Sequence, residues 1–173
     1  MRKRIKIKKA FSDKQIAKRI DKLGATIRKD AGKGEVFLLG VLKGTSFFIA
    51  DLMRAIPGDV TYGFIDVIRD MADTGPTAME IDYLQYSDIG GRNVYLLKDV
   101  VSTGVIETYL LNQLRQKNPH SLKLVAPVDR PELRTVELEV DFRAFEADHR
   151  GSFAGYGLEL DGKHGNLPYI GRV

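Results

Sequence analysis

The 173-residue sequence contains no cysteine. Its absence excludes a disulfide framework, a thiolate metal site and a cysteine nucleophile, so the fold must depend on packing alone. No apolar run approaches the roughly 20 residues that a membrane-spanning helix needs. The basic start is followed by alternating isoleucine and lysine, not by the apolar core of a signal peptide. We therefore expect a cytoplasmic protein with no membrane partner.

The composition, 43% apolar and 29% charged without long biased tracts, is typical of a globular protein. A chain of this length fits one domain, residues 1–173, with a core of its own. Six of residues 2–9 are lysine or arginine, within a net charge of +4. This segment is either an edge strand protected by lysines or a surface that steers phosphate or nucleic acid.

Apolar spacing predicts the first elements of the chain. Ser12 and Gln15 form a capping-box pattern, and the isoleucine and leucine spacing that follows predicts a helix over 13–30, ending near Gly32. The continuous apolar run 36–42 predicts a buried strand, and a helix from Thr45 to Ile56 follows it. Further strands are expected at 60–68, 79–85, 93–98 and 122–128, with a helix from Gly104 to about Gln116.

This alternation of strands and helices predicts an α/β fold with a central, mainly parallel sheet flanked by helices. Ligands of such folds bind beyond the carboxyl ends of the strands. The shorter apolar pieces 141–146 and 154–160 suggest a small hood laid over the sheet.

Two strand-loop-helix junctions could hold anions. Residues 40–45 combine glycines, Lys43 and a helix start, which suits a phosphate or pyrophosphate. Residues 99–104 place Ser102 and Thr103 before a second helix, where a phosphate monoester could bind. Without a ligand, the first junction is an ordinary turn and the second a helix capped by serine or threonine.

These segments carry a family resemblance. Residues 36–56 resemble the strand, pyrophosphate loop and helix of hypoxanthine-guanine phosphoribosyltransferases, and 96–104 resemble their phosphoribosyl-diphosphate (PRPP) motif. The ending 155–171 is similar to the C-terminal segment of that family. The resemblance implies the type I phosphoribosyltransferase fold with its hood, a dimer or tetramer, and Mg²⁺ as the cofactor of an active enzyme.

The resemblance also implies roles for particular residues. The ribose side would be met by Lys98 and Asp99, and a metal by Asp99 and Glu159. The purine would be met by Arg130, Phe153 and Glu159. The pyrophosphate and 5′-phosphate loops would comprise Leu42, Lys43, Gly44, Ser102, Thr103, Gly104, Val105 and Ile106.

Several positions depart from the family pattern. Lys98 replaces one carboxylate of the PRPP motif, and Ser102 replaces the aspartate that faces the purine N7 as proton acceptor. Residues 69–76 lack the Ser-Tyr pair of the mobile loop. Arg130 replaces the lysine that reads the purine 6-oxo group, and Gly165 replaces an arginine that meets pyrophosphate.

A serine cannot accept a proton near neutral pH as a carboxylate does. The sequence therefore predicts a family member that binds GMP, IMP or PRPP, with Asp99 and Ser102 at the catalytic positions and catalysis weakened or lost. The alternative is an active transferase of purine salvage. RNA binding through the basic N-terminus is a minor alternative without a motif to support it. The three histidines are scattered and predict no metal site.

Overall fold

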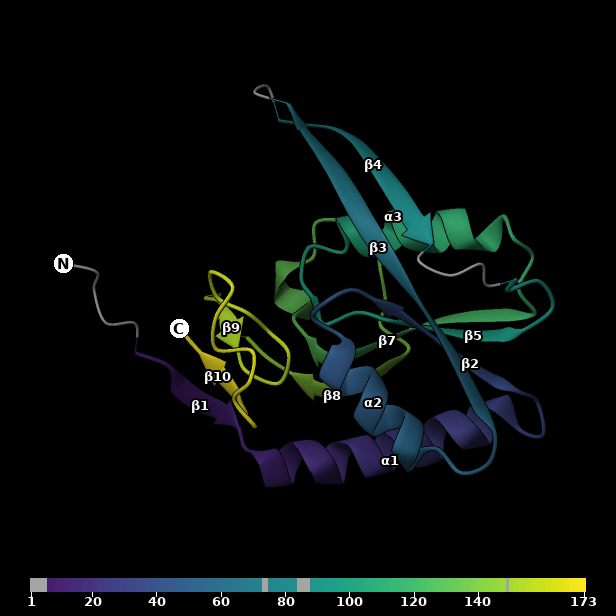
Figure 1. Ribbon diagram of the computed structural model, residues 1–173, viewed down its shortest axis with the longest axis horizontal. Coiled ribbons are helices and arrows are strands. Elements are labelled where there is room, and N and C mark those ends of the chain that lie inside the picture. The colour runs from purple at the N-terminus through teal and green to yellow at the C-terminus, as the bar shows by residue number, and fades with distance from the viewer. Residues whose placement is uncertain (1–5, 73–74, 84–87, 149) are drawn as a thin grey trace.

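The computed structural model of the protein describes residues 6–72, 75–83, 88–148 and 150–173. Its centre is a seven-stranded sheet in the order β4-β3-β2-β5-β7-β6, with β8 paired to β7 (Figure 1). All neighbouring strands are parallel except the β3–β4 hairpin. The strands are β2 (Val36–Val41), β3 (Val60–Ala72), β4 (Gly75–Tyr83), β5 (Asn93–Leu97), β6 (Val100–Val101), β7 (Ser121–Asp129) and β8 (Phe142–Glu146).

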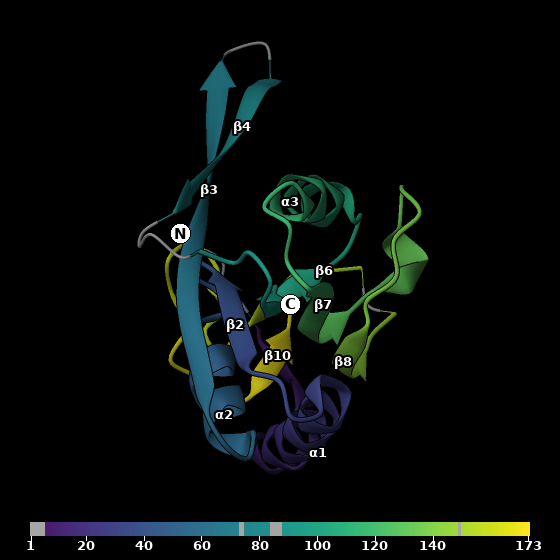
Figure 2. The same ribbon diagram turned by 90° about the vertical axis from the view of Figure 1, so that its right-hand side faces the viewer.

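Helices cover both faces of the sheet. The helices α1 (Asp13–Ala31) and α2 (Ser46–Ala55) pack on one face, and α3 (Val105–Arg115) packs on the other (Figure 2). A short 3-10 turn, Pro131–Leu133, follows β7. The mainly parallel α/β architecture expected from the sequence is confirmed.

Strand β2 lies at the middle of both cores. All six of its residues are buried, and successive side chains point to opposite faces of the sheet. Leu38 belongs to the core cluster beneath α1 and α2, whereas Phe37 and Leu39 belong to the cluster beneath α3. The continuous apolar run is therefore explained by burial on both faces.

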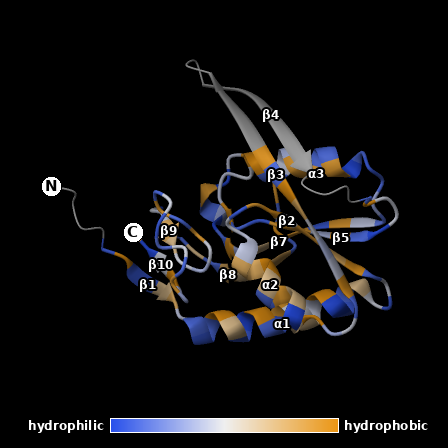
Figure 3. Ribbon diagram, in the orientation of Figure 1, coloured by the Kyte–Doolittle hydropathy of each residue, from blue (hydrophilic) through white to orange (hydrophobic). Residues whose placement is uncertain are grey.

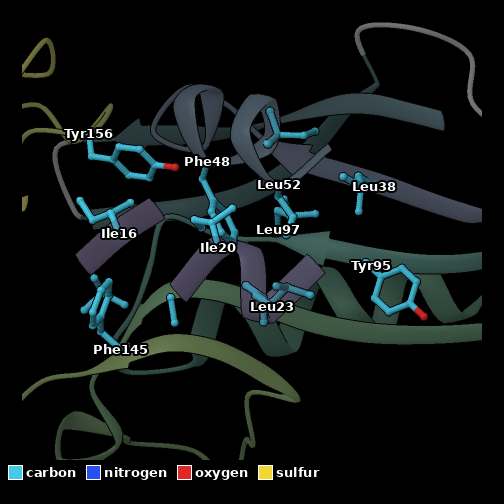
Figure 4. Close-up of a cluster of buried hydrophobic side chains, with 14 of the residues drawn as sticks. Ile16, Ile20, Leu23, Leu38, Phe48, Leu52, Tyr95, Leu97, Phe145 and Tyr156 are labelled. Carbon is cyan, nitrogen blue, oxygen red and sulfur yellow. The ribbon is translucent and has the colours of Figure 1, made fainter. Parts of the chain in front are cut away.

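Helix α1 begins with the predicted capping box. The N–H of Gln15 donates to the Ser12 hydroxyl (3.3 Å), and the N–H of Ser12 donates to the Gln15 side chain (2.9 Å). Figure 3 shows hydrophobic and hydrophilic segments alternating along the helix. Ile16, Ile20 and Leu23 turn toward α2 and the sheet (Figure 4). Gly32 ends the helix with φ 59°, which favours glycine.

A small second sheet forms the hood. It contains β1 (Lys8–Phe11), β10 (Ile170–Arg172) and β9 (Phe153–Ala154) in that order, all antiparallel. Lys8 and Lys9 are exposed on its edge strand β1. This agrees with the interpretation of the basic segment as an edge strand protected by lysines. The assignment of 141–146 to the hood is wrong. This segment is β8, which pairs in parallel with β7 in the main sheet, because Ala144 and Phe145 bury their side chains against the core.

Two strand boundaries and one helix cap also differ from the sequence prediction. Strand β3 continues to Ala72 and β4 begins at Gly75, so the stretch 69–76 forms the two arms of a hairpin, with 73–74 outside the described residues. The predicted strand 79–85 starts earlier, and its last two residues are not described. Thr45 occupies the N-cap of α2, but its buried hydroxyl donates to the carbonyl of Val41 (2.7 Å) and does not cap the helix.

Gly24 lets α1 approach α2 closely, and this contact predicts an unusual mutational effect. A Cβ at position 24 would lie 2.5 Å from the carbonyl oxygen of Ala55. Alanine is about 1 kcal/mol better than glycine within a helix, but overpacking of a tight contact typically costs about 1–3 kcal/mol. We expect Gly24→Ala to lower the free energy of unfolding, measured with urea. The exposed control Asp21→Ala in the same helix should not lower it, and a Gly24→Ala protein as stable as the wild type would contradict this packing.

Candidate functional site

Two loops meet at the carboxyl edge of the sheet. The loop after β2 contains Leu42, Lys43 and Gly44, and the one after β5 contains Lys98 and Asp99. They touch at Gly44, where a Cβ would lie 2.3 Å from Oδ2 of Asp99. Only glycine allows this approach. The peptide bond between Leu42 and Lys43 is cis.

Asp99 is held by its neighbours in the chain. Its Oδ1 accepts the N–H of Val100 (2.9 Å) and pairs with the ammonium group of Lys98. The two side chains are mostly buried, with 16% of Lys98 and 28% of Asp99 exposed. One carboxylate of the site therefore already has a cation beside it.

The second loop leads into the N-terminus of α3. Gly104 is the N-cap with φ 85°, and no side chain caps the helix. The interpretation of Ser102 or Thr103 as an ordinary N-cap is therefore wrong. Because the first N–H groups of a helix lack internal acceptors, the backbone here can receive an anion. Thr103 and Val105 are exposed beside these groups, while Gly104 is buried and Ile106 is half-buried.

Two arginines fix the position of Ser102. The Ser102 hydroxyl accepts from Nε (2.9 Å) and Nη2 (2.6 Å) of Arg130, and its carbonyl accepts from Nη1 of Arg134 (2.6 Å). Arg130 also donates to the carbonyl of Gly151 (2.8 Å). Burial lowers the pKa of the Arg130 guanidinium from its ordinary value.

Arg130 lies over the ring of Phe153, 5.5 Å from its centroid. Phe153 and Tyr156 are buried in the core, with only 7% and 6% of their surfaces exposed. The Tyr156 hydroxyl donates to Oδ2 of Asp51 (2.7 Å), and burial together with this bond raises the pKa of Tyr156. Both rings pack between the hood and the main sheet.

Glu159 closes the far side of the first loop. Its carboxylate lies 2.6 Å from Nζ of Lys43. The two side chains border a pocket of about 520 Å³ between the first loop and the C-terminal segment. The pocket is lined by Lys43, Ser46, Phe47, Gly157, Glu159, Gly162, Lys163, His164, Gly165 and Asn166.

Sequence reasoning missed several of these residues. Arg134 and Asp129 form a buried ion pair, and Arg134 also donates to the carbonyl of Ser102. Arg134 lies in the run 132–139, which contains three glutamates, and no local pattern distinguishes it. Phe47 and His164 also line the pocket. Both lie in segments that resemble the family, but the sequence predicted no role for either side chain.

The described part of the chain contains no group of three or more histidine, aspartate or glutamate side chains that could hold a metal. His149 lies outside the described residues. In that same part, no helix is both long and apolar enough to cross a membrane.

Comparison with known proteins decides the family. The sequence model of the phosphoribosyl transferase domain matches residues 8–160. A hypoxanthine-guanine phosphoribosyltransferase of Streptococcus pneumoniae is 35% identical over 170 residues, covering 95% of this chain and 92% of that protein. The chain belongs to the hypoxanthine-guanine phosphoribosyltransferase family. A second relative of that name, from Bacillus subtilis, is 30% identical over 163 residues, covering 93% of this chain and 89% of that protein.

Solved structures of the family share the architecture. A hypoxanthine-guanine phosphoribosyltransferase of Bacillus anthracis, with a HEPES molecule in its active site, superposes with a TM-score of 0.88. It is 30% identical, and the match covers 97% of this chain and 99% of that one. A hypoxanthine phosphoribosyltransferase of Trypanosoma cruzi gives the same score at 25% identity, covering 99% of this chain and 94% of that one. The type I phosphoribosyltransferase fold is thus confirmed.

The contact between Gly44 and Asp99 predicts that the site tolerates no side chain at position 44. Gly44→Ala would place a methyl group 2.3 Å from the Asp99 carboxylate, so the two loops must separate. We expect affinity for GMP, measured by calorimetry, to fall by about tenfold or more, which corresponds to about 1.4 kcal/mol.

A matched control is Gly90→Ala, where the nearest atom is a flexible carboxylate oxygen of the exposed Asp88 at 3.2 Å. This variant should bind GMP as the wild type does. Undiminished GMP binding by Gly44→Ala would contradict the assignment of this contact to the site.

Proposed function

We propose that the protein transfers the phosphoribosyl group of PRPP to hypoxanthine or guanine and releases pyrophosphate. In this reaction the bond from C1′ to the pyrophosphate oxygen breaks, a bond from C1′ to N9 of the purine forms, and the proton that the purine ring loses passes to solvent. The contact of the two anion loops at Gly44 and Asp99 is the observation that carries the proposal. The curated relatives named above support it, because the match extends over nearly the whole chain.

The phosphorylated end of the substrate fits the two loops. The uncapped start of α3, at Thr103, Gly104, Val105 and Ile106, would hold the 5′-phosphate through backbone N–H groups. Leu42, Lys43 and Gly44 would hold the pyrophosphate, with Lys43 exchanging its Glu159 partner for a phosphate oxygen. These residues bind and orient PRPP so that C1′ faces the base.

The ribose would lie against Asp99 and Lys98. Mg²⁺ bound by proteins usually keeps a few carboxylate contacts and takes its remaining ligands from substrate phosphates and water. Asp99 would fit that pattern as a protein ligand if Lys98 leaves its carboxylate, and Glu159 would fit it if Lys43 leaves. When bound, Mg²⁺ would neutralise charge on the departing pyrophosphate.

The purine would lie at the Arg130 side of the site. Arg130 can donate to the 6-oxo group of hypoxanthine or guanine. The guanidinium of Arg130 lies over the ring of Phe153. Glu159 borders the adjoining pocket and would face the opposite side of the base.

A second candidate function is purine nucleotide binding without efficient turnover. The observation that favours it is the hydrogen bonding of Ser102, whose hydroxyl already accepts two N–H groups of Arg130. A hydroxyl has two lone pairs, so Ser102 has no further acceptor for a proton from the base. General acid–base catalysis typically contributes about 10²- to 10⁴-fold, and this share would be absent.

Calorimetry and a product assay on the same protein separate the two functions. We expect GMP and IMP to bind, and PRPP with Mg²⁺ and hypoxanthine or guanine to give nucleotide slowly. Ser102→Asp should raise kcat by about 10²-fold or more, whereas Asp99→Asn should lower it. GMP binding with no product from the wild type or from Ser102→Asp would overturn the transferase and leave the second candidate.

Lys98 predicts an unusual dependence on metal. Its ammonium group opposes a divalent cation near Asp99, because like charges repel at short range. We expect Lys98→Gln to reach half-maximal activity at a Mg²⁺ concentration about tenfold lower than the wild type. The exposed, distant Lys33→Gln is the charge-matched control. An unchanged Mg²⁺ requirement in Lys98→Gln would show that Lys98 does not act on the metal.

We further propose that the protein self-associates as a dimer or tetramer. One aromatic side chain on β3, that of Tyr62, is 52% exposed outside the candidate pocket. Aromatic residues are enriched at the centres of protein interfaces. Sedimentation equilibrium tests this proposal, and a monomer mass at every concentration would refute it.

A further inference from the structure

A long groove lies between α1 and β8, which run close together (Figure 2). Its volume is about 890 Å³, and it shares no lining residue with the pocket bordered by Lys43 and Glu159. A smaller pocket of about 250 Å³ continues it along the same helix. Together the two hollows, here called the α1–β8 groove, extend from Gln15 to Thr26, over which a helix rises about 16 Å. The groove is therefore long enough for an extended ligand.

The walls of the α1–β8 groove are cationic. Lys18, Arg19 and Lys22 line it from α1, and Arg143 lines it from β8. All four residues are exposed. Arg143 is paired with Glu146 (3.0 Å). In the part of the chain that the structure describes, no carboxylate forms an ion pair with the other three. Three cations are therefore available to an anion.

These three cations repel one another along the helix. Lys18 and Lys22 are four residues apart, and Arg19 and Lys22 are three apart, spacings at which like charges destabilise a helix. Asp13 and Asp21, two exposed acids of the same helix, do not line the groove. A helix face that serves only solubility usually alternates the sign of its charges. An anionic ligand therefore explains this face better than solvation alone.

The floor of the groove indicates the kind of anion. Phe145 is only 8% exposed, because its ring stacks on that of Phe11 with the centroids 4.0 Å apart. The guanidinium of Arg19 covers the same ring, 5.8 Å from its centroid. Little apolar surface is left for the side chains of an acidic peptide or for stacked bases. The cationic surface continues to the exposed Lys8 and Lys9 on β1, which suits a ligand with regularly repeated charges.

We propose that the α1–β8 groove binds single-stranded nucleic acid through its phosphodiester backbone, without reading the bases. Proteins that bind single strands without sequence preference use a positively charged groove that follows the backbone. The cations that carry this inference lie on α1 and not in the basic N-terminal segment. Lys18, Arg19 and Lys22 would each meet a phosphate. Each phosphate neutralised on a single strand contributes about −0.7 to the slope of log affinity against log salt, so we expect a slope of about −2.

Fluorescence anisotropy with a labelled oligothymidylate of about 20 nucleotides tests the groove. The double variant Lys18→Gln/Lys22→Gln should lower the affinity about tenfold or more at about 0.1 M salt, and its salt slope should be shallower by about 1.4. Glutamine forms helices about as well as lysine, and both positions are exposed, so the fold should persist. Urea unfolding checks this.

The charge-matched control is Lys29→Gln/Lys33→Gln, which removes two exposed cations outside the groove. It should change the affinity by less than about twofold, because charges beyond the binding surface are screened by salt. An equal loss of affinity in the two double variants would show that only the net charge of the protein matters, and would overturn the inference. Failure of the wild type to bind the oligonucleotide at about 50 mM salt would overturn it as well.

Two competitors identify where and what the groove binds. Saturating GMP should leave the oligonucleotide bound, and displacement by GMP would move the oligonucleotide to the anion loops, which would overturn the inference and leave the proposed function intact. Poly-glutamate at the same charge concentration should compete weakly, because a nucleic acid strand gains affinity by releasing condensed counterions. Displacement by poly-glutamate at that concentration would assign the groove to an acidic peptide and would also overturn the inference.

Discussion

The burial of β2 on both faces is the constraint on which the site depends. This strand pairs in parallel with β3 on one side and β5 on the other, and none of its residues reaches solvent. Parallel pairing brings the carboxyl ends of β2 and β5 to the same edge of the sheet. The two loops that follow can then meet at Gly44 and Asp99, although more than fifty residues separate them in the sequence.

The charged side chains in and around the site form ion pairs with one another. Lys98 pairs with Asp99, Lys43 with Glu159, and Arg134 with Asp129. These pairs are not equivalent, because the Lys43 side chain is 73% exposed, whereas the Asp129 side chain is 3% exposed. An exposed pair contributes little to stability and is easily exchanged for a ligand, but breaking a buried pair is costly. Lys43 is therefore suited to a mobile role in the loop after β2, and Arg134 to a fixed one beside Ser102.

Much of this structure could be predicted from local patterns. The capping box at Ser12, the apolar run of β2 and the glycine-rich junctions each determine a local conformation, and each is confirmed. The errors concern contacts between distant segments. The pairing of β8 with β7 depends on a neighbouring strand that no local pattern reveals. Thr45 looks like a helix cap, but in its buried position its hydroxyl bonds instead to the carbonyl of Val41.

In the candidate site, too, local conformation could be predicted from the sequence, whereas contacts between distant segments could not. The two strand-loop-helix junctions could be predicted, because backbone turns and helix starts favour glycine, serine and threonine. The support of Ser102 by Arg130 and Arg134 could not, since both arginines follow β7 and contact the end of the neighbouring strand β6, which lies more than twenty residues earlier in the sequence. The substitution of Ser102 was visible in the sequence. Its bonding to Arg130, which leaves it only a donor, is visible only in three dimensions.

The central claim is that the two loops and Arg130 together form one purine nucleotide site, and the position of GMP in a crystal structure of the complex tests it most directly. The account predicts the phosphate at the start of α3, against the backbone of Thr103 to Ile106, and the purine ring beside Arg130. A phosphate bound elsewhere, or a ring turned away from Arg130, would contradict it.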